Sequence, residues 1–290
     1  MNLRIAFIIN PISGVVKKDK IINQIKSRLS SKFDYAVAFT RRPGHATDLC
    51  RDFVQQGMNI VVAVGGDGSV NEVAKGLVHT DTALGIIPGG SGNGLAHHLS
   101  IPVNFEKAID IINSANIIKI DTGTINDELF ASIAGIGFDG VVARKFSETK
   151  RRGFLSYLKI VTETYPTYKP KHYKIIFNDQ QIKTQALFIT FANSNQFGYN
   201  TAIAPEARVD DGLLDVCIAK KPPIIELPYL ASLLYWRKID QSKYLEIYQA
   251  NKLKVITKKN RWVNIDGEAR KLGKKLNIRI HPQSLKIVIP

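Results

Sequence analysis

Residues 60–72 read IVVAVGGDGSVNE, an apolar run that ends in a glycine loop with one acidic residue. A continuous apolar run of this length is typical of a strand buried on both faces of a parallel sheet. The glycines would let the backbone approach a phosphate group, and the N–H groups that start the next helix favour negative charge. Asp67 would repel phosphate unless Mg²⁺ or a substrate hydroxyl lies between them. The alternative is a glycine-rich turn in which Asp67 caps the helix.

Two similar combinations of strand and loop flank this stretch. Residues 3–9 are apolar and end in Asn10-Pro11-Ile12-Ser13-Gly14, and residues 83–87 are followed by PGGSGNG at 88–94. Between these runs the apolar residues have helical spacing. We therefore expect strands at 3–9, 35–39, 60–64 and 83–87, and helices at 20–29, 46–56 and 70–77.

This alternation predicts a parallel sheet covered by helices, in which ligands bind beyond the carboxyl ends of the strands. All three glycine loops fall at that edge, so we predict a nucleotide site there, with Ser91 and Asn93 as hydrogen-bond donors. No loop fits the dinucleotide pattern G-x-G-x-x-G or the phosphate-loop pattern G-x-x-x-x-G-K-[ST]. Neither a Rossmann dinucleotide site nor a P-loop is therefore supported.

After about residue 120 the sequence consists of short β-rich segments, several separated by turn signals such as Asn178-Asp179. We expect strands at 117–120, 129–136, 173–177, 186–192, 213–219, 252–256, 262–265, 276–280 and 285–289, with helices near 154–164 and 224–236. The pattern predicts an antiparallel β-sandwich. We therefore divide the chain into a nucleotide-binding α/β domain, residues 1–120, and a β-sandwich domain, residues 121–281.

Composition narrows the class of protein. The chain has 290 residues, of which 44% are hydrophobic and 22% charged, an ordinary balance for a globular protein. No apolar run reaches the roughly 20 residues of a membrane-spanning helix, and two cysteines are too few for a disulfide framework or a zinc site. We expect a cytoplasmic, reduced protein.

The net charge is +15, and residues 121–290 hold 27 Lys and Arg against 16 Asp and Glu. This excess indicates either an anionic partner or a solvated basic face.

Considered together, the motifs resemble the diacylglycerol-kinase catalytic domain family, which includes bacterial lipid kinases, sphingosine kinases and ceramide kinases and is related to NAD kinases. The resemblance covers nearly the whole chain, in the family's order. It rests on Asn10-Pro11-x-Ser13-Gly14, Thr40 with Gly44-His45-Ala46, residues 65–69 with Asn71-Glu72, residues 88–93, residues 135–139, DDGLLDV at 210–216 and Asp266-Gly267-Glu268.

The resemblance implies an ATP-dependent kinase that uses Mg²⁺ and transfers the γ-phosphoryl group to a lipid hydroxyl. It also implies that the last strand, at about 282–290, returns to complete the first domain. By the resemblance and the glycine loops, the nucleotide site comprises Asn10, Ser13, Thr40, Gly65, Gly66, Asp67, Gly68, Ser69, Asn71, Glu72, Gly90, Ser91 and Asn93. A structural Mg²⁺ would be held by Asp211 with the backbone carbonyls of Arg208 and Leu213. Asp121 and Asp139 would contact the substrate, although both could equally be turn residues.

The sequence departs from the family pattern in its second glycine loop. Most bacterial relatives have an acidic residue where this chain has Gly94, and the Pro-x-Gly-Ser-Gly-Asn form is similar to that of sphingosine kinases. The acceptor could therefore be diacylglycerol or a sphingoid base. In the first loop, Ser69 replaces the usual threonine but keeps its hydroxyl.

A lipid hydroxyl needs a proton acceptor when it attacks the γ-phosphate. By resemblance the acceptor lies in Asp266-Gly267-Glu268, after the predicted strand 262–265. We favour Glu268 as the acceptor and Asp266 as its metal-side partner, with Asp67 as a third catalytic residue, and the reverse assignment of the pair stays open. The alternative is an Asp-Gly hairpin turn, with Glu268 on the surface and paired to Arg270 or Lys271.

Two other functions remain open at this point. One is an NAD kinase, which shares the Gly-Gly-Asp-Gly loop, and the other is a basic nucleic-acid-binding protein, for which no recognised module is present. We expect no nucleic-acid partner. We expect a peripheral protein at the inner face of the membrane that binds anionic lipid through its C-terminal part; the sequence leaves a homodimer open. The expectation rests on the basic excess of this part and on Lys145, Lys150, Arg151, Arg152 and Lys159, which are close in sequence to the aromatic residues Phe146, Phe154 and Tyr157.

Overall fold

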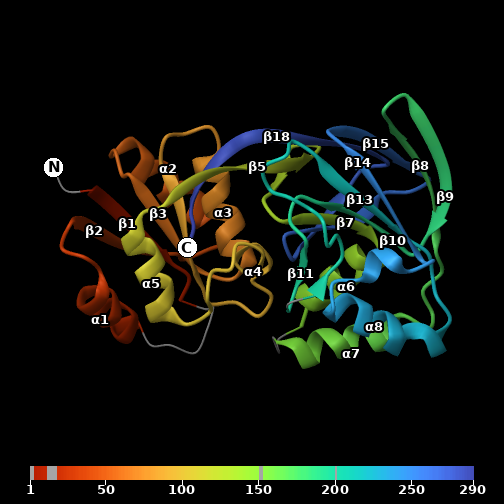
Figure 1. Cartoon of the computed structure of the whole chain (residues 1–290), viewed down its shortest axis with the longest axis horizontal. Coiled ribbons are helices and arrows are strands. Elements are labelled where there is room, and N and C mark those ends of the chain that lie inside the picture. Colours follow the sequence, from red (N-terminus) through yellow and green to blue (C-terminus); the bar gives the residue numbers. More distant parts are fainter. Residues whose placement is uncertain (1–2, 12–17, 150–152, 200) are drawn as a thin grey trace. The chain divides into compact units, whose positions relative to one another are not determined.

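A computed structural model describes residues 3–11, 18–149, 153–199 and 201–290 (Figure 1). The chain divides into two compact units. The first comprises Met1–Ile120 and Gln283–Pro290, and the second comprises Asp121–Pro282. No helix in the described ranges has the length and apolar character needed to cross a membrane.

The first unit contains a parallel sheet with the strand order β2-β1-β3-β4. Its strands are β1 (Leu3–Ile9), β2 (Phe33–Phe39), β3 (Ile60–Gly65) and β4 (Ala83–Pro88). Its helices are α1 (Lys18–Arg28), α2 (His45–Gln55), α3 (Asp67–Leu77), α4 (Gly94–His98) and α5 (Phe105–Ser114). Every residue of β3 and β4 is buried, as their continuous apolar sequences predict.

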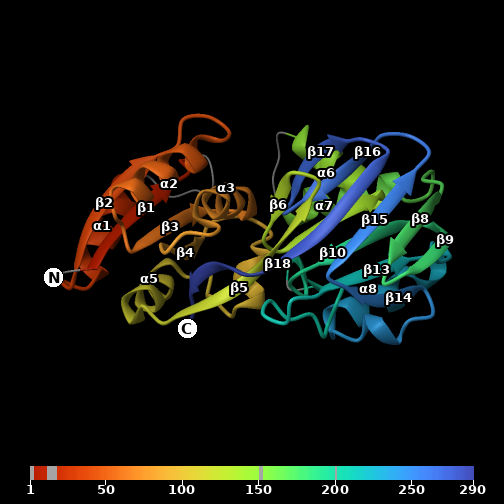
Figure 2. The ribbon, with the colours of Figure 1, turned by 90° about the horizontal axis from the view of Figure 1, so that it is seen from above.

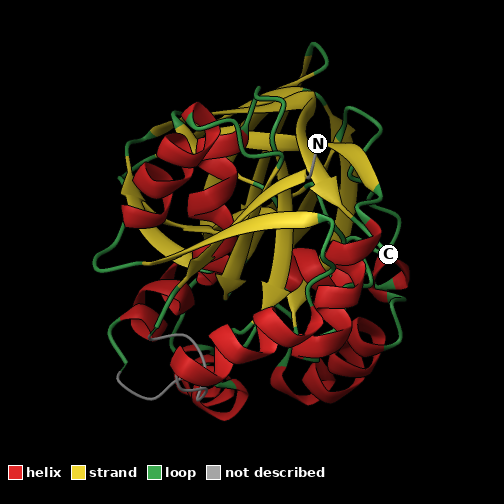
Figure 3. Cartoon of the chain, turned by 90° about the vertical axis from the view of Figure 1, so that its left-hand side faces the viewer, coloured by secondary structure: helices red, strands yellow, loops and turns green. Residues whose placement is uncertain are grey.

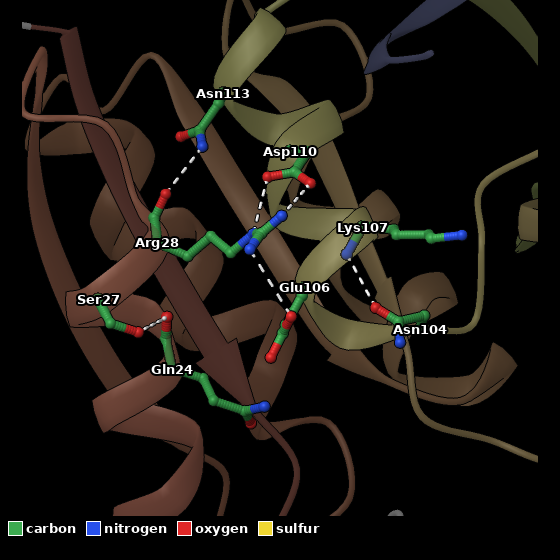
Figure 4. A network of polar contacts seen from close by, with 8 residues as sticks. All are labelled: Gln24, Ser27, Arg28, Asn104, Glu106, Lys107, Asp110 and Asn113. Atoms are coloured by element: carbon green, nitrogen blue, oxygen red, sulfur yellow. Dashed lines mark hydrogen bonds and ion pairs between the residues drawn. The ribbon is translucent and has the colours of Figure 1, made fainter.

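Helices cover both faces of this sheet (Figures 1 and 2). Ile25 of α1 and Ile109 of α5 pack with Phe7 and Val62 on one face, while α2 and α3 pack together on the other. The sequence pattern does not predict α5, which is joined to α1 by polar contacts (Figure 4). The Arg28 guanidinium binds both carboxylate oxygens of Asp110, at 2.9 and 2.8 Å, and lowers the pKa of that carboxyl.

The second unit is an antiparallel sandwich. One sheet has the strand order β14-β13-β10-β7-β16-β17, and the other contains β18, β15, β8 and β9, with β5 paired to both β18 and β6. Side chains such as Phe191, Val216 and Val255 fill the core of the sandwich. The strands are β5 (Ile117–Ile125), which begins in the first unit, β6 (Glu128–Phe130), β7 (Ile133–Gly137), β8 (Lys171–Phe177), β9 (Gln180–Ala186), β10 (Phe188–Ala192), β11 (Gln196–Gly198), β12 (Thr201–Ala202), β13 (Leu214–Ala219), β14 (Leu245–Ala250), β15 (Lys252–Thr257), β16 (Arg261–Ile265), β17 (Glu268–Leu272) and β18 (Lys275–Val288).

Helices lie against the outer face of the six-stranded sheet. Helices and strands are coloured differently in Figure 3. They are α6 (Phe138–Ser147), α7 (Phe154–Thr164), α8 (Leu227–Tyr235) and the 3₁₀ turns η1 (Ile224–Glu226) and η2 (Ile239–Gln241). The predicted helix at 224–236 is divided into η1 and α8, because Pro228 occupies the first turn of α8, where a proline is tolerated. The fold class predicted from the sequence is confirmed.

Several predicted boundaries were wrong. Segments 276–280 and 285–289 form one strand, β18, because the fixed φ of Pro282 is compatible with an extended strand. Ile287 of β18 pairs with Leu84 of β4, so the C-terminal strand returns to the first unit as the resemblance implied. Segment 129–136 is divided into β6 and β7. The weakly apolar β9 and β14, and helix α6, have no clear signal in the sequence.

Candidate active site

The glycine loops after β3 and β4 meet Asn10, at the end of β1, at one edge of the sheet, because β1, β3 and β4 are parallel neighbours. The Asn10 side-chain amide donates a hydrogen bond to Ser69 Oγ at 3.2 Å. The Gly89 N–H donates to the Gly65 carbonyl at 2.8 Å. The structure therefore brings these predicted nucleotide residues together, whereas Ser13 lies outside the described residues.

The loops after β3 and β4 touch through their backbones. A Cβ on Gly90 would collide with the Cα of Gly66, and a Cβ on Gly66 would lie 3.1 Å from the Cα of Gly90. Only glycine allows this approach. At the point of contact the edge is therefore formed by main chain, without a side chain at Gly66 or Gly90 that would exclude a phosphate group.

Asp67 connects the same two loops. One carboxylate oxygen accepts the Asn93 N–H at 2.8 Å and the other accepts the Gly94 N–H at 2.7 Å. Burial raises the pKa of Asp67, and these two N–H groups act in the opposite direction. Asn93 has a φ of 52° and bonds twice with the backbone of Gly90, which closes the second loop.

The first loop is shorter than predicted, because α3 already begins at Asp67 and residues 67–69 form its first turn. Backbone N–H groups at the start of a helix have no intrahelical acceptor and favour an anion. The segment 65–69 therefore still presents hydrogen-bond donors at the loop edge.

Glu72, which we predicted in the nucleotide site, binds the start of α2. Its two carboxylate oxygens accept the N–H groups of Gly44 and Ala46, at 2.8 and 3.1 Å. The Thr47 hydroxyl donates to the Glu72 carbonyl at 2.7 Å. This explains why a glycine at 44 and an acid at 72 occur together in the motif, and a nucleotide contact for Glu72 stays a prediction. Thr40 lies at the end of β2, where its N–H donates to Ile9.

In the second unit, Asp139 is buried at the start of α6. The Asn264 amide donates to both of its carboxylate oxygens, at 3.0 and 3.1 Å. Burial raises the pKa of Asp139 to about 6, although Asn264 lowers it in part. A Cβ on Gly135 would occupy the position of the Asp139 carboxylate, so this glycine makes room for it. Asn264 was missed by the sequence analysis; its only signal is a polar residue inside a buried strand, just before Asp266-Gly267.

Asp266 and Gly267 form a two-residue hairpin turn between β16 and β17, with φ values of 44° and 86°. The Asp266 carboxylate accepts the N–H groups of Ala131, Ser132 and Ile133 at 2.7 to 2.9 Å. The chain turns to present these three donors, which is why the predicted strand 129–136 is interrupted. Glu268 is half-exposed, and its carboxylate lies 2.8 Å from Arg270. This local geometry is that of the hairpin alternative, and catalytic roles for the two acids remain predictions.

The DDGLLD segment is held by Asp121, which is fully buried and accepts the Gly212 N–H at 2.7 Å. The Asp211 carboxylate accepts the Leu213 N–H at 2.9 Å, and Arg208 pairs with Asp210. One carboxylate and two carbonyls are hard oxygen donors of the kind that Mg²⁺ prefers, so the residues fit the ion in chemical type. Among the described residues no group of three or more His, Cys, Asp or Glu side chains could hold a metal.

Comparisons with known families cover nearly the whole chain. A family model described as a diacylglycerol kinase catalytic domain matches residues 4–125. A second model, the YegS C-terminal NAD kinase beta sandwich-like domain, matches residues 132–289, which is more than half of the chain. The chain belongs to the diacylglycerol-kinase-type lipid kinase family.

Named members of this lipid kinase family are distant relatives. A diacylglycerol kinase of Staphylococcus saprophyticus is 25% identical, over 97% of this chain and 94% of its own length. A diacylglycerol kinase of Bacillus subtilis is 27% identical, over 91% and 89%. A solved structure from Bacillus anthracis str. Sterne, a candidate diacylglycerol kinase, shares the fold with a TM-score of 0.84 and 23% identity, over 99% of this chain and 97% of that one. The family predicted from the motifs is thereby confirmed.

Proposed function

We propose that this lipid kinase transfers the γ-phosphoryl group of ATP to the hydroxyl of a lipid, with Mg²⁺. The observation that carries the proposal is the pair of glycine loops joined by Asp67, in a chain that belongs to the lipid kinase family. The names of the relatives favour diacylglycerol as the acceptor, and the sphingosine-kinase form of the second loop favours a sphingoid base.

In this proposal the loops of the first unit bind the ATP phosphates. Backbone N–H groups in the first turn of α3 and at Ser91 and Gly92 donate to phosphate oxygens, and the absence of side chains at Gly66 and Gly90 lets the phosphates approach. Asp67 holds the two loops in register. Bound Mg²⁺ would neutralise charge that develops on the phosphoryl group.

The second unit supplies the acids that handle the acceptor. Asp139, fixed by Asn264, accepts a hydrogen bond from the polar head of the lipid, and Asp121 orders the loop that contains Asp211. Glu268 takes the proton of the attacking hydroxyl. It is the better placed of the two acids, because Asp266 already accepts three backbone N–H groups and is only 6% exposed.

We also propose that the protein meets the bilayer through the surface of α7, η1 and α8, which we call the apolar helix face. Leu155, Ile225 and Trp236 are 80%, 87% and 68% exposed there, and Phe154, Leu158, Ile224, Tyr229 and Tyr235 add to it. Isolated exposed apolar side chains are common, but eight of them on three short helical segments indicate an interaction surface. Leu227 of α8 packs in the same apolar cluster as Ile160 and Val161 of α7, so these segments are neighbours. Lys159 on α7 and Lys145 on α6 add positive charge nearby, whereas Lys150, Arg151 and Arg152 lie outside the described residues.

The test of the reaction is a phosphoryl-transfer assay with γ-labelled ATP across diacylglycerol, monoacylglycerol, sphingosine, ceramide and NAD. Label transfer to one lipid and none to NAD would support the proposal and name the acceptor. Transfer to NAD alone would show that the protein is an NAD kinase.

For the membrane surface, Leu155→Ser with Ile225→Ser should weaken binding to anionic vesicles. The exposed pair Val103→Ser and Leu3→Ser is the control, and equal binding by both pairs would contradict this surface.

A further inference from the structure

The outer face of β18, β15, β8 and β9 carries positive charge and no acidic residue. The inner side of these strands packs into the sandwich core, where Val255 and Ile175 are buried. Six of the alternating outward positions are basic, and we call their surface the basic face: Lys174, Lys183, Lys252, Lys254, Lys275 and Arg279. The outward positions between them are His172, Ile176, Gln181, Gln185, Ile256 and Asn277.

Strand register places like charges directly opposite one another on this face. Lys174 is the cross-strand partner of Lys183, and Lys252 is the partner of Arg279. Like charges in such positions destabilise a sheet. In the described part of the chain no ion pair involves any of the six basic residues. The arrangement therefore costs stability in the free protein, and a bound anion would offset that cost.

A hollow of about 540 Å³ opens in the basic face. Its lining combines the outward side chains of His172, Lys174, Lys183, Gln185 and Ile256 with Lys258, just after β15, and with Tyr173, Thr184 and Thr257. This volume is in the range of sites for small molecules. Lysine ammonium groups bind phosphate as point charges. The outward positions hold no Phe, Tyr or Trp, so the face lacks the stacking surface that single-stranded nucleic acid uses.

We propose that this hollow binds a small soluble molecule with two or more phosphate groups, at a site made from none of the glycine-loop residues. Lys174 and Lys183 are direct cross-strand partners, so two phosphate groups of one molecule can each bind one of the two ammonium groups. A single monoanion cannot neutralise both charges. Binding stabilises the second unit, because it neutralises the repulsion between Lys174 and Lys183. The proposal does not depend on the kinase reaction, so either can fail without the other.

The test uses inorganic tripolyphosphate as the probe and the full-length protein. Calorimetry gives the Kd, and hydrogen exchange locates the site because bound segments become protected. We expect protection at 172–185 and 254–258, in addition to any at the glycine loops. Lys174→Gln with Lys183→Gln should raise the Kd of this site by at least about tenfold, since two charge-assisted hydrogen bonds are lost. Without the probe, at low salt, the same variant should melt at a higher temperature than the wild type.

The control is Lys26→Gln with Lys107→Gln, two exposed lysines on α1 and α5 whose replacement changes the net charge equally. It should leave the Kd of the hollow unchanged. Equal affinity in the two double variants, or protection confined to residues 65–72 and 88–94, would overturn the proposal. Vesicles that contain phosphatidic acid form a further arm. The protein could bind these vesicles in a way that Lys174→Gln with Lys183→Gln abolishes and that tripolyphosphate does not compete with. The basic face would then be a membrane surface, and this result would overturn the soluble ligand.

Discussion

Asp67 in the first unit and Asp266 in the second both accept hydrogen bonds from backbone N–H groups of a segment distant in the sequence. Asp67 receives two, from Asn93 and Gly94, where the two glycine loops meet. Asp266 receives three, from residues 131–133, in the hairpin turn that leads to Glu268. In both places the carboxylate fixes a loop through main-chain N–H groups. Around Asp67 the loops that it joins have glycine backbone at their point of contact, which suits an anion, whereas Asp266 is followed by the half-exposed carboxylate of Glu268.

The strongest way to break this comparison is to remove Asp67. Asp67→Ala should abolish phosphoryl transfer, because the N–H groups of Asn93 and Gly94 lose their acceptor and the second loop loses its anchor. The fold should survive, with the free energy of unfolding lowered by about 1–3 kcal/mol. Steady-state kinetics and urea unfolding measure the two effects. Asp52→Ala, at an exposed position of α2, is the control. Near-normal kcat in the Asp67 variant would remove Asp67 from the mechanism.

The next effect concerns Glu268 in the second unit. Glu268→Gln should lower kcat by roughly 10²–10⁴-fold with little change in the KM for ATP, which is the usual contribution of a general base. Asp266→Asn should act on stability instead, because an amide offers one acceptor oxygen to three N–H groups. If Glu268→Gln keeps full kcat while Asp266→Asn loses kcat and stays folded, the two roles are reversed. If both keep full kcat, the motif is only a hairpin turn.

Asp139 should make stability depend on pH. Its pKa is raised from 3.8 to about 6 by burial, so the folded protein binds more protons than the unfolded chain between these values. The free energy of unfolding should therefore fall as pH rises from 4 to 6, by about 3 kcal/mol in total at 1.4 kcal/mol per pKa unit. Asp139→Asn should lack this decline in urea unfolding, whereas Asp179→Asn, in the exposed β8–β9 turn, should follow the wild type. Parallel curves for all three proteins would contradict the assignment.

The smallest effect concerns the cap on α2. Glu72→Gln leaves the N–H of Gly44 or Ala46 without its carboxylate acceptor and should lower the free energy of unfolding by about 1–2 kcal/mol. If Glu72 acts only as this cap, the KM for ATP should stay within a few-fold of the wild type. A rise of more than tenfold, with unchanged stability, would show that Glu72 contacts the nucleotide. Thr47→Val, which removes a hydrogen bond at the same helix start, is the matched control.

The local features of the fold were predictable because neighbouring residues decide them. The apolar runs at 3–9, 60–64 and 83–87 predict buried strands, and glycines directly after them predict loops at one edge of the sheet. Helix α7 has the boundaries that its helical spacing indicates. Less was predictable where the pattern is weak, as in β9, whose sequence QQIKTQA has few apolar residues. Such a strand forms because its partner β8 supplies the ladder of hydrogen bonds.

By itself, the sequence determined the family, the order of strands and helices from β1 to β4, and the positions of the glycine loops. Only the tertiary structure decided which groups the acids bind. Asp67 reaches N–H groups 26 and 27 positions away, and Asp266 reaches N–H groups 133 to 135 positions away. The like charges of the basic face are likewise neighbours only through strand register. The physical reason is that spacing along the chain encodes burial and turns, whereas hydrogen bonds and charge repulsion depend on distances that exist only after the strands have paired.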